Sequence, residues 1–181
     1  EKKQPAHYLV VPAGGTGLVL RGLRKEPATI GKWHLGWDLT YKEGKAKTVD
    51  NIDFTKRVAN GPTDRGFDYF YGLTSPSGPP HLYMVNDMAE KQPNTRFEES
   101  GGGLYKIKGG IGHSDWSADG MQPHLADKML EYLDENKDSD KPFFLYMALT
   151  APHIPLFPSK EFKGKSKIGD YGDLVMMIDD I

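Results

Sequence analysis

The sequence contains no cysteine, so it offers no disulfide, no thiolate ligand for a metal and no thiol nucleophile. It also lacks any run approaching the ~18 apolar residues from which a membrane-spanning helix is built. No charge of one sign dominates, because 25 acidic residues oppose 23 basic ones and the formal charge is −2. We therefore expect no membrane span and no nucleic-acid partner.

The composition that remains is that of a globular protein of about one domain, with 181 residues, 38% of them hydrophobic and 27% charged. Glycine and proline are abundant, with 21 and 13 residues. Many positions are therefore expected in turns and loops, where binding and catalytic residues tend to lie.

The opening segment, residues 1–27, shows no clear structural period and is left unassigned. Its glycine run, Gly14–Gly17, lacks the Gly-Lys-Ser/Thr ending of a phosphate-binding loop and the Gly-x-Gly-x-x-Gly spacing of a dinucleotide site. We interpret this run as a turn. Histidine His7, in the same segment, has no partner motif.

The second half of the chain has clearer periods. A helix is predicted from Pro123, with an apolar stripe formed by Ala126, Met129, Leu130 and Leu133. The continuous apolar run 143–149 predicts a strand that is buried on both faces. A second amphipathic helix follows, with Asp170 as its N-cap and an apolar stripe formed by Tyr171, Leu174, Val175 and Ile178.

Helix, buried strand, loop and helix in this order are typical of an α/β layered fold. In such folds, ligands bind beyond the carboxyl ends of the parallel strands. The residues that directly follow each predicted strand are therefore the first candidates for a functional site.

One such candidate is the segment Gly31–Gly36, which follows a short strand predicted to end at residues 28–30, with Gly31 as its breaker. In an extended segment, Lys32 and His34 point to the same side. An ammonium group beside an imidazole can hold an anion and move a proton. An ordinary surface lysine and a packed histidine explain the spacing equally well, so the pair alone is weak evidence.

The second candidate is His153, which follows the apolar run 143–149 and lies between Pro152 and Pro155. Prolines restrict the backbone and so fix the direction of this imidazole, which suits a general acid or base. The alternative is a structural loop histidine. The other histidines, His81, His113 and His124 among them, have a structural or solvated role as their default, and the pair Asp179–Asp180 is interpreted as a polar helix end.

Taken together, these segments resemble the sulfatase family. The segments that carry the resemblance are Gly31–Gly36, Arg65–Gly72, Pro142–Tyr146 with Ala151–Pro155, and Phe162–Ser166 with Tyr171–Asp173. They occur in the family's order and are most similar to arylsulfatases and N-acetylgalactosamine-6-sulfatases.

The resemblance implies an α/β, alkaline-phosphatase-like fold, a mixed sheet with helices on both faces. It implies a sulfuric ester hydrolase that acts on aryl or carbohydrate sulfate esters, with a sulfated small molecule or glycan as its partner. By family habit, the protein would be secreted or periplasmic.

The resemblance also implies roles for particular residues. Lys32 would hold a sulfate oxygen, and His34 would assist the hydrated aldehyde that attacks sulfur. His153 would bind the ester side and protonate the leaving alcohol. A serine that helps to position the hydrate would correspond to Ser75 or Ser77, and the sequence does not choose between them.

Two parts of the family's machinery are missing from the sequence. It has no Cys/Ser-x-Pro/Ala-x-Arg motif from which formylglycine is made, and it has neither the early aspartate pair nor the later Asp-Asn pair that bind calcium. We therefore expect residues 28–181 to be an incomplete sulfatase catalytic domain, an internal fragment without metal ligands that is inactive on its own. The alternatives are a phosphodiesterase or phosphonate hydrolase of the same superfamily and a degenerate, catalytically inactive chain.

Overall fold

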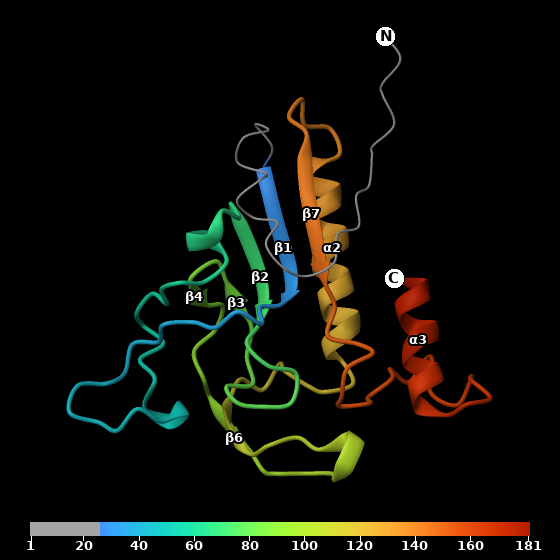
Figure 1. The fold of residues 1–181 in the computed structure, drawn as a ribbon, viewed down its shortest axis with the longest axis horizontal. Coiled ribbons are helices and arrows are strands. Elements are labelled where there is room, and N and C mark those ends of the chain that lie inside the picture. Colours follow the sequence, from blue (N-terminus) through green and yellow to red (C-terminus); the bar gives the residue numbers. More distant parts are fainter. Residues whose placement is uncertain (1–25) are drawn as a thin grey trace.

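The computed structural model describes residues 26–181, in which one mixed β-sheet forms the centre of the fold (Figure 1). Its strand order is β4-β3-β2-β1-β7. The three parallel strands are β1 (Glu26–Lys32), β2 (Tyr69–Leu73) and β7 (Phe143–Ala148), and a short antiparallel hairpin of β3 (Met84–Val85) and β4 (Met88–Ala89) extends the sheet beyond β2. This arrangement confirms the predicted α/β class with a mixed sheet.

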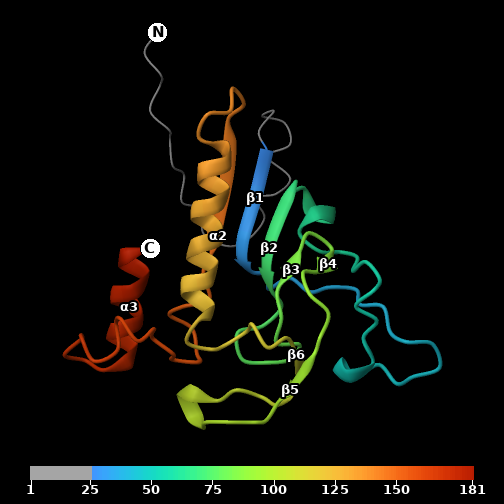
Figure 2. The same ribbon diagram turned by 180° about the vertical axis from the view of Figure 1, so that it is seen from behind.

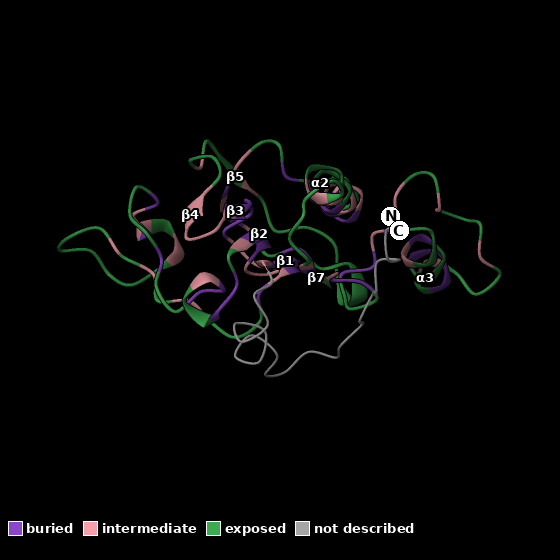
Figure 3. Cartoon of the chain, turned by 90° about the horizontal axis from the view of Figure 1, so that it is seen from above, coloured by how far each residue is buried: buried purple, intermediate pink, exposed green. Residues whose placement is uncertain are grey.

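Two α-helices accompany the sheet, α2 (Met121–Asn136) and α3 (Asp170–Asp180). A separate two-stranded sheet consists of β5 (Thr95–Phe97) and β6 (Gly110–Gly112). Short 3₁₀ turns lie at Val49–Asn51, Thr63–Arg65 and Gly103–Tyr105. Figure 2 shows α2 running along one face of the sheet, whereas α3 lies beside β7 in Figure 3.

The two faces of the sheet are covered in different ways. On one face, Leu125 and Met129 of α2 pack against Ile30 and Tyr71. The other face is covered by side chains from the long connection between β1 and β2 and from the strands themselves, and they form one apolar cluster. Its members include Trp33, Ile52, Phe54, Phe67, Phe70 and Phe144. Burial of these large apolar groups on both faces is the main stabilising contribution to the sheet.

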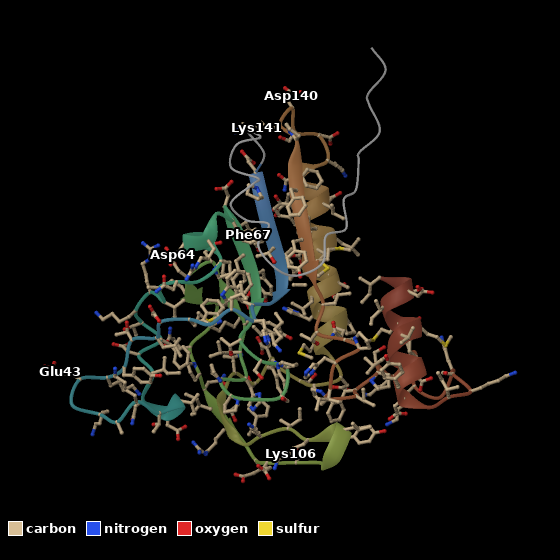
Figure 4. All side chains as sticks on the ribbon, in the orientation of Figure 1. Glu43, Asp64, Phe67, Lys106, Asp140 and Lys141 are labelled. Carbon is tan, nitrogen blue, oxygen red and sulfur yellow. The ribbon has the colours of Figure 1, made fainter. Side chains whose placement is uncertain are left out.

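The sheet can be orientated by its charged ends (Figure 4). Asp140 and Lys141 lie beside the amino ends of β1 and β7, where the Lys141 ammonium is 2.8 Å from a carboxylate oxygen of Glu26. Lys106 lies at the opposite end, in the loops beyond the carboxyl ends of the strands.

The first helix prediction was correct in type and wrong in its buried face. Helix α2 begins at Met121 rather than at Pro123, and Leu130 has 62% of its surface exposed. The sheet instead covers the overlapping stripe of Leu125, Met129 and Tyr132. Because successive helical residues are rotated by about 100°, two stripes one residue apart look alike in sequence.

The strand predicted at 143–149 is confirmed as β7, but its burial on both faces is not. Met147 is 46% exposed, and Phe144 alone among the strand residues is buried, with 8% of its surface exposed. Within the described residues, β7 is the outermost strand and pairs only with β1, so its side chains have packing partners on fewer sides.

The second helix is confirmed as α3, with a different cap and a different face. Its N-cap is Gly169 rather than Asp170, and no side chain caps it. Tyr171 and Val175 are exposed, because the helix packs through Leu174 and Met177 against a small cluster that contains Ala151 and Leu156.

Two further expectations changed in detail. Gly31 does not end its strand, since β1 continues to Lys32, which is in register with Leu73 of β2, whereas the pairing with β7 ends at Gly31. Residues 74–112, where many glycines and prolines favour loops, also contain the β3–β4 hairpin and both strands β5 and β6. The predicted turn at Gly14–Gly17 and residue His7 lie outside the described residues.

Candidate active site

The candidate site lies where the three parallel strands end. Lys32 of β1 is in register with Leu73 of β2, and Gly31 is in register with Ala148 of β7. Because the strands are parallel, the segments that follow them leave from the same edge of the sheet. The structure thus brings the segments with Lys32 and His153, predicted from separate motifs, to one edge.

Gly31 determines how closely β1 and β7 approach at this edge. Its φ angle is +131°, a region that other residues rarely adopt. A Cβ atom at this position would also collide with the backbone carbonyl of Ala148. Lys32 follows directly as the last residue of β1, and it makes no ion pair within residues 26–181. Its ammonium group is therefore available for an anion.

Trp33 anchors the turn that carries His34. The Trp33 indole is buried against Phe67, with ring centroids 6.3 Å apart, and its Nε1 donates a hydrogen bond to the Gly36 carbonyl oxygen at 2.9 Å. The residues on either side alternate with it, so Lys32 is half-buried and His34 is exposed. This alternation agrees with the expectation that Lys32 and His34 share a side.

His153 lies in a tight loop after β7, between two proline peptide bonds that are both cis, Ala151–Pro152 and Ile154–Pro155. Its backbone N–H donates to the Thr150 carbonyl oxygen at 3.1 Å. Its ring Nδ1 lies 2.6 Å from the Ile154 carbonyl oxygen. Because a carbonyl can only accept, Nδ1 carries the hydrogen, and Nε2 is left as the nitrogen that exchanges a proton with a ligand.

Gln122, in the first turn of α2, holds the loop that leads to His153. Its Nε2 donates to the Thr150 hydroxyl, and both side chains are buried. Sequence reasoning missed Gln122, because nothing in a contact between residues 28 positions apart can be read from local spacing.

Ser75 and Ser77 follow β2 and so belong to the same edge. The Ser75 hydroxyl oxygen accepts a hydrogen bond from the Gly78 N–H at 3.0 Å, and the Ser77 carbonyl oxygen accepts one from the Lys108 N–H at 2.8 Å. Both side chains are partly exposed, so either serine remains a candidate for the family's positioning serine.

His81 has a structural role, which is one of the two roles that the sequence predicts for it. It is fully buried, its ring centroid lies 4.4 Å from that of Trp116 in a tilted arrangement, and its Nε2 lies 2.7 Å from the Lys108 carbonyl oxygen. Its Nδ1 has no hydrogen-bond partner among the described residues. Burial lowers the pKa of His81 below its ordinary value, so the neutral ring is favoured.

A second polar network, which is partly buried and is called the interior network below, joins β2, the segment after β4 and α2. The Tyr71 hydroxyl donates to a Glu90 carboxylate oxygen at 2.8 Å and lies 2.7 Å from Nε2 of His124. Burial raises the pKa of Tyr71 and lowers that of His124, and the Lys128 ammonium lies 5.3 Å from the centre of the Tyr71 ring. Sequence reasoning treated His124 alone and did not find this network.

The described residues do not assemble a site for calcium. Within residues 26–181, no three His, Asp or Glu side chains gather closely enough to hold a metal ion. Asp179 and Asp180 are exposed at the end of α3, as a polar helix end should be. No helix in this part of the chain is both long and apolar enough to cross a membrane.

The site thus combines a free ammonium group and two exposed imidazoles at the carboxyl edge of an α/β sheet. The family model for sulfatases matches residues 19–181. The chain belongs to the sulfatase family.

Individual relatives agree with this assignment. N-acetylgalactosamine-6-sulfatase of Sus scrofa is 30% identical over 166 residues, which are 90% of this chain and 26% of the relative. N-acetylgalactosamine-6-O-sulfatase of Bacteroides thetaiotaomicron is 26% identical, over 83% of this chain and 34% of the relative. The chain therefore spans about a quarter to a third of the length of these relatives.

Solved structures show the same fold. A sulfatase from glycosaminoglycan metabolism in Bacteroides thetaiotaomicron superimposes with a TM-score of 0.66 at 21% identity, over 88% of this chain and 38% of that chain. The PsFucS1 sulfatase from Pseudoalteromonas sp. superimposes with a TM-score of 0.57, also at 21% identity, over 91% of this chain and 32% of that chain.

Proposed function

We propose that the chain is part of the catalytic domain of a sulfuric ester hydrolase that acts on aryl or carbohydrate sulfates. The observation that carries the proposal is the placement of Lys32 and His153 after adjacent parallel strands, within the segment that matches the sulfatase family. The incomplete extent of the domain is supported by its short span of the relatives and by the absence of a formylglycine motif.

Each residue has a chemical role in this proposal. Lys32 neutralises charge on the sulfate oxygens as the ester is cleaved. When the sulfur–oxygen ester bond breaks, the leaving oxygen takes both bonding electrons and receives the proton from Nε2 of a protonated His153. The hydrogen bond from Nδ1 to the Ile154 carbonyl oxygen holds the ring so that Nε2 is the donor. His34 assists the attacking group.

The attacking group and the metal are assigned to no residue of this chain. In the family, a formylglycine hydrate supplies the nucleophile and calcium helps to hold the sulfate. We propose that both belong to parts of the protein other than residues 26–181.

A sulfated glycan is the substrate class that we favour. Support comes from the names of the relatives, which are sulfatases of N-acetylgalactosamine 6-sulfate. A secreted or periplasmic location accords with such a substrate, which is found outside the cytoplasm.

The proposal is tested with two preparations. The chain of 181 residues, incubated with nitrophenyl sulfate and calcium, should show no turnover above a Lys32→Ala/His153→Ala control, because it holds no nucleophile. The protein encoded by the complete reading frame should release sulfate from N-acetylgalactosamine 6-sulfate. Faster cleavage of a nitrophenyl phosphodiester by the complete protein would favour the phosphodiesterase alternative and contradict the proposal.

A further inference from the structure

A cavity of about 320 Å³ lies beyond the same edge of the sheet, close along the chain to His153. It is enclosed by the turn at Gly103–Tyr105, the segment before α2, the segment 156–163 and the start of α3. Its volume is at the lower end of the ~300–1,000 Å³ typical of small-molecule sites. The residues that line it include Tyr105, Phe157, Lys160, Lys163, Asp119 and Asp170.

Aromatic rings form one wall of the cavity. The rings of Tyr105 and Phe157 meet edge to face, with centroids 6.1 Å apart. The Leu156 N–H donates to the Leu104 carbonyl oxygen at 2.8 Å, which ties this wall to the loop that carries His153. Tyr105 is nonetheless partly exposed, so its ring offers an apolar surface to a ligand. Aromatic surfaces of this kind suit the apolar face of a sugar ring.

The loop that carries Lys160 and Lys163 is held in place by contacts with α3. The fully buried carboxylate of Asp173 accepts hydrogen bonds from the N–H groups of Gly164 at 2.7 Å and Ser166 at 2.6 Å. Phe162 packs against the cluster that contains Leu174. Charge-assisted bonds to a buried carboxylate are stronger than neutral ones, so this loop is organised before any ligand arrives.

Charged groups of both signs line the cavity. Lys160 and Lys163 are exposed, and neither makes an ion pair within the part of the chain that the structure describes. The Asp170 carboxylate interacts with the Tyr105 hydroxyl and raises the pKa of Tyr105, and Asp119 is exposed. The free ammonium groups can bind an anionic substituent, and the carboxylates can accept hydrogen bonds from hydroxyl groups.

We propose that this cavity binds an acidic sugar unit that neighbours the sulfated unit of a glycan. The sugar ring rests on the wall of Tyr105 and Phe157, and its carboxylate or sulfate is held by Lys160 and Lys163. This inference rests on the proposed function, because it assigns a glycan rather than an aryl sulfate as the substrate.

Binding alone tests the proposal, so no turnover is required. The 181-residue chain is titrated by calorimetry with three tetrasaccharides: one that contains uronic acid and no sulfate, one that carries sulfate and no uronate, and one that is neutral. At least one acidic tetrasaccharide should bind at least tenfold more tightly than the neutral one. The two acidic arms distinguish a carboxylate from a sulfate as the bound group.

Matched variants then locate the binding. Lys160→Met/Lys163→Met should weaken binding of the acidic tetrasaccharide at least tenfold. Lys165→Met/Lys167→Met removes the same charge from the same loop outside the cavity and should change it less than threefold. Tyr105→Ala should weaken binding at unchanged charge.

Equal binding of the neutral tetrasaccharide, equal losses in both lysine pairs, or no binding by the wild-type chain would each overturn the inference. Because no ester is cleaved, these outcomes are separate from failure of the proposed function. In the complete protein, the Lys160→Met/Lys163→Met variant is compared with the wild type for release of sulfate from glycans. An equal KM would support the proposed function and contradict glycan binding in this cavity.

Discussion

The histidines of this molecule occupy two contrasting environments. At the carboxyl edge of the sheet, His34 and His153 are exposed, and His153 keeps one ring nitrogen free. Elsewhere in the molecule, His81 is fully buried beside Trp116, and His124 is half-buried against Tyr71. The exposed histidines at the edge of the sheet are available for proton transfer, whereas the buried ones contribute to packing.

The contrast separates two kinds of contribution. Edge residues lose little solvent contact on folding, so their substitution should affect binding and turnover and leave stability nearly unchanged. Residues of the interior network satisfy one another's polar atoms, so their substitution should affect stability first. Experiments can contradict this division between effects on activity and effects on stability.

The largest expected effect is on leaving-group protonation. In the complete protein, His153→Ala should lower turnover of a sugar sulfate by about 10²–10⁴-fold, because a general acid typically contributes that much. Turnover of nitrophenyl sulfate should fall far less, since nitrophenolate leaves without a proton. Equal losses on the two substrates, measured as kcat, would remove His153 from the acid role.

The second largest expected effect follows from removal of the Lys32 ammonium group. Lys32→Ala in the complete protein should reduce kcat/KM for an aryl sulfate by more than tenfold, because the sulfate charge loses its counterion. The midpoint of denaturant unfolding should stay close to that of the wild type, as Lys32 makes no ion pair within residues 26–181. An alanine variant with full turnover would place Lys32 outside the site.

A smaller effect is expected in the interior. Tyr71→Phe removes the hydroxyl that contacts both Glu90 and His124, and leaves their polar atoms without this partner. The free energy of unfolding should fall by roughly 1–2 kcal/mol. Tyr171→Phe, at an exposed position, is the matched control and should change the unfolding curve very little.

The smallest effect concerns pH. Burial lowers the pKa of folded His81 below its ordinary value, near ~6.5 in an unfolded chain. The unfolded state therefore binds more protons, and stability that is present above pH ~6.5 is lost as the pH falls towards the folded pKa. In His81→Gln, which keeps a donor for the Lys108 carbonyl oxygen, the loss of unfolding free energy between pH 7 and 5 should be shallower. The same slope in both proteins would contradict a buried neutral ring at this position.

The edge of the sheet could be predicted from sequence because its signals are local. Gly31, Lys32 and His34 are close neighbours, and the apolar run before His153 is long enough to indicate a strand. Each site residue could thus be placed at a strand end without knowing the fold, and the parallel order of β1 and β7 then joined them.

The interior network could not be predicted, because its members are distant in sequence. Tyr71 lies 19 positions from Glu90 and 53 positions from His124, and no period links them. The predictions of which helix faces are buried were wrong for a related reason. Periodicity identifies an apolar stripe, but what covers the stripe is a tertiary contact, and at Leu130 and Val175 the described structure leaves the side chain exposed.

Gly31, the residue before Lys32, has a consequence for the geometry of the candidate site. Lys32 ends β1 and His153 lies in the loop that follows β7, so their separation depends on the spacing between these two strands. At Gly31 that spacing leaves no room for a side chain beside Ala148. Any Cβ there would wedge β1 and β7 apart, and a displacement of about 1 Å between reacting groups can cost ~10²-fold in rate. The absence of a side chain at Gly31 thus sets the backbone spacing on which the separation of Lys32 and His153 depends.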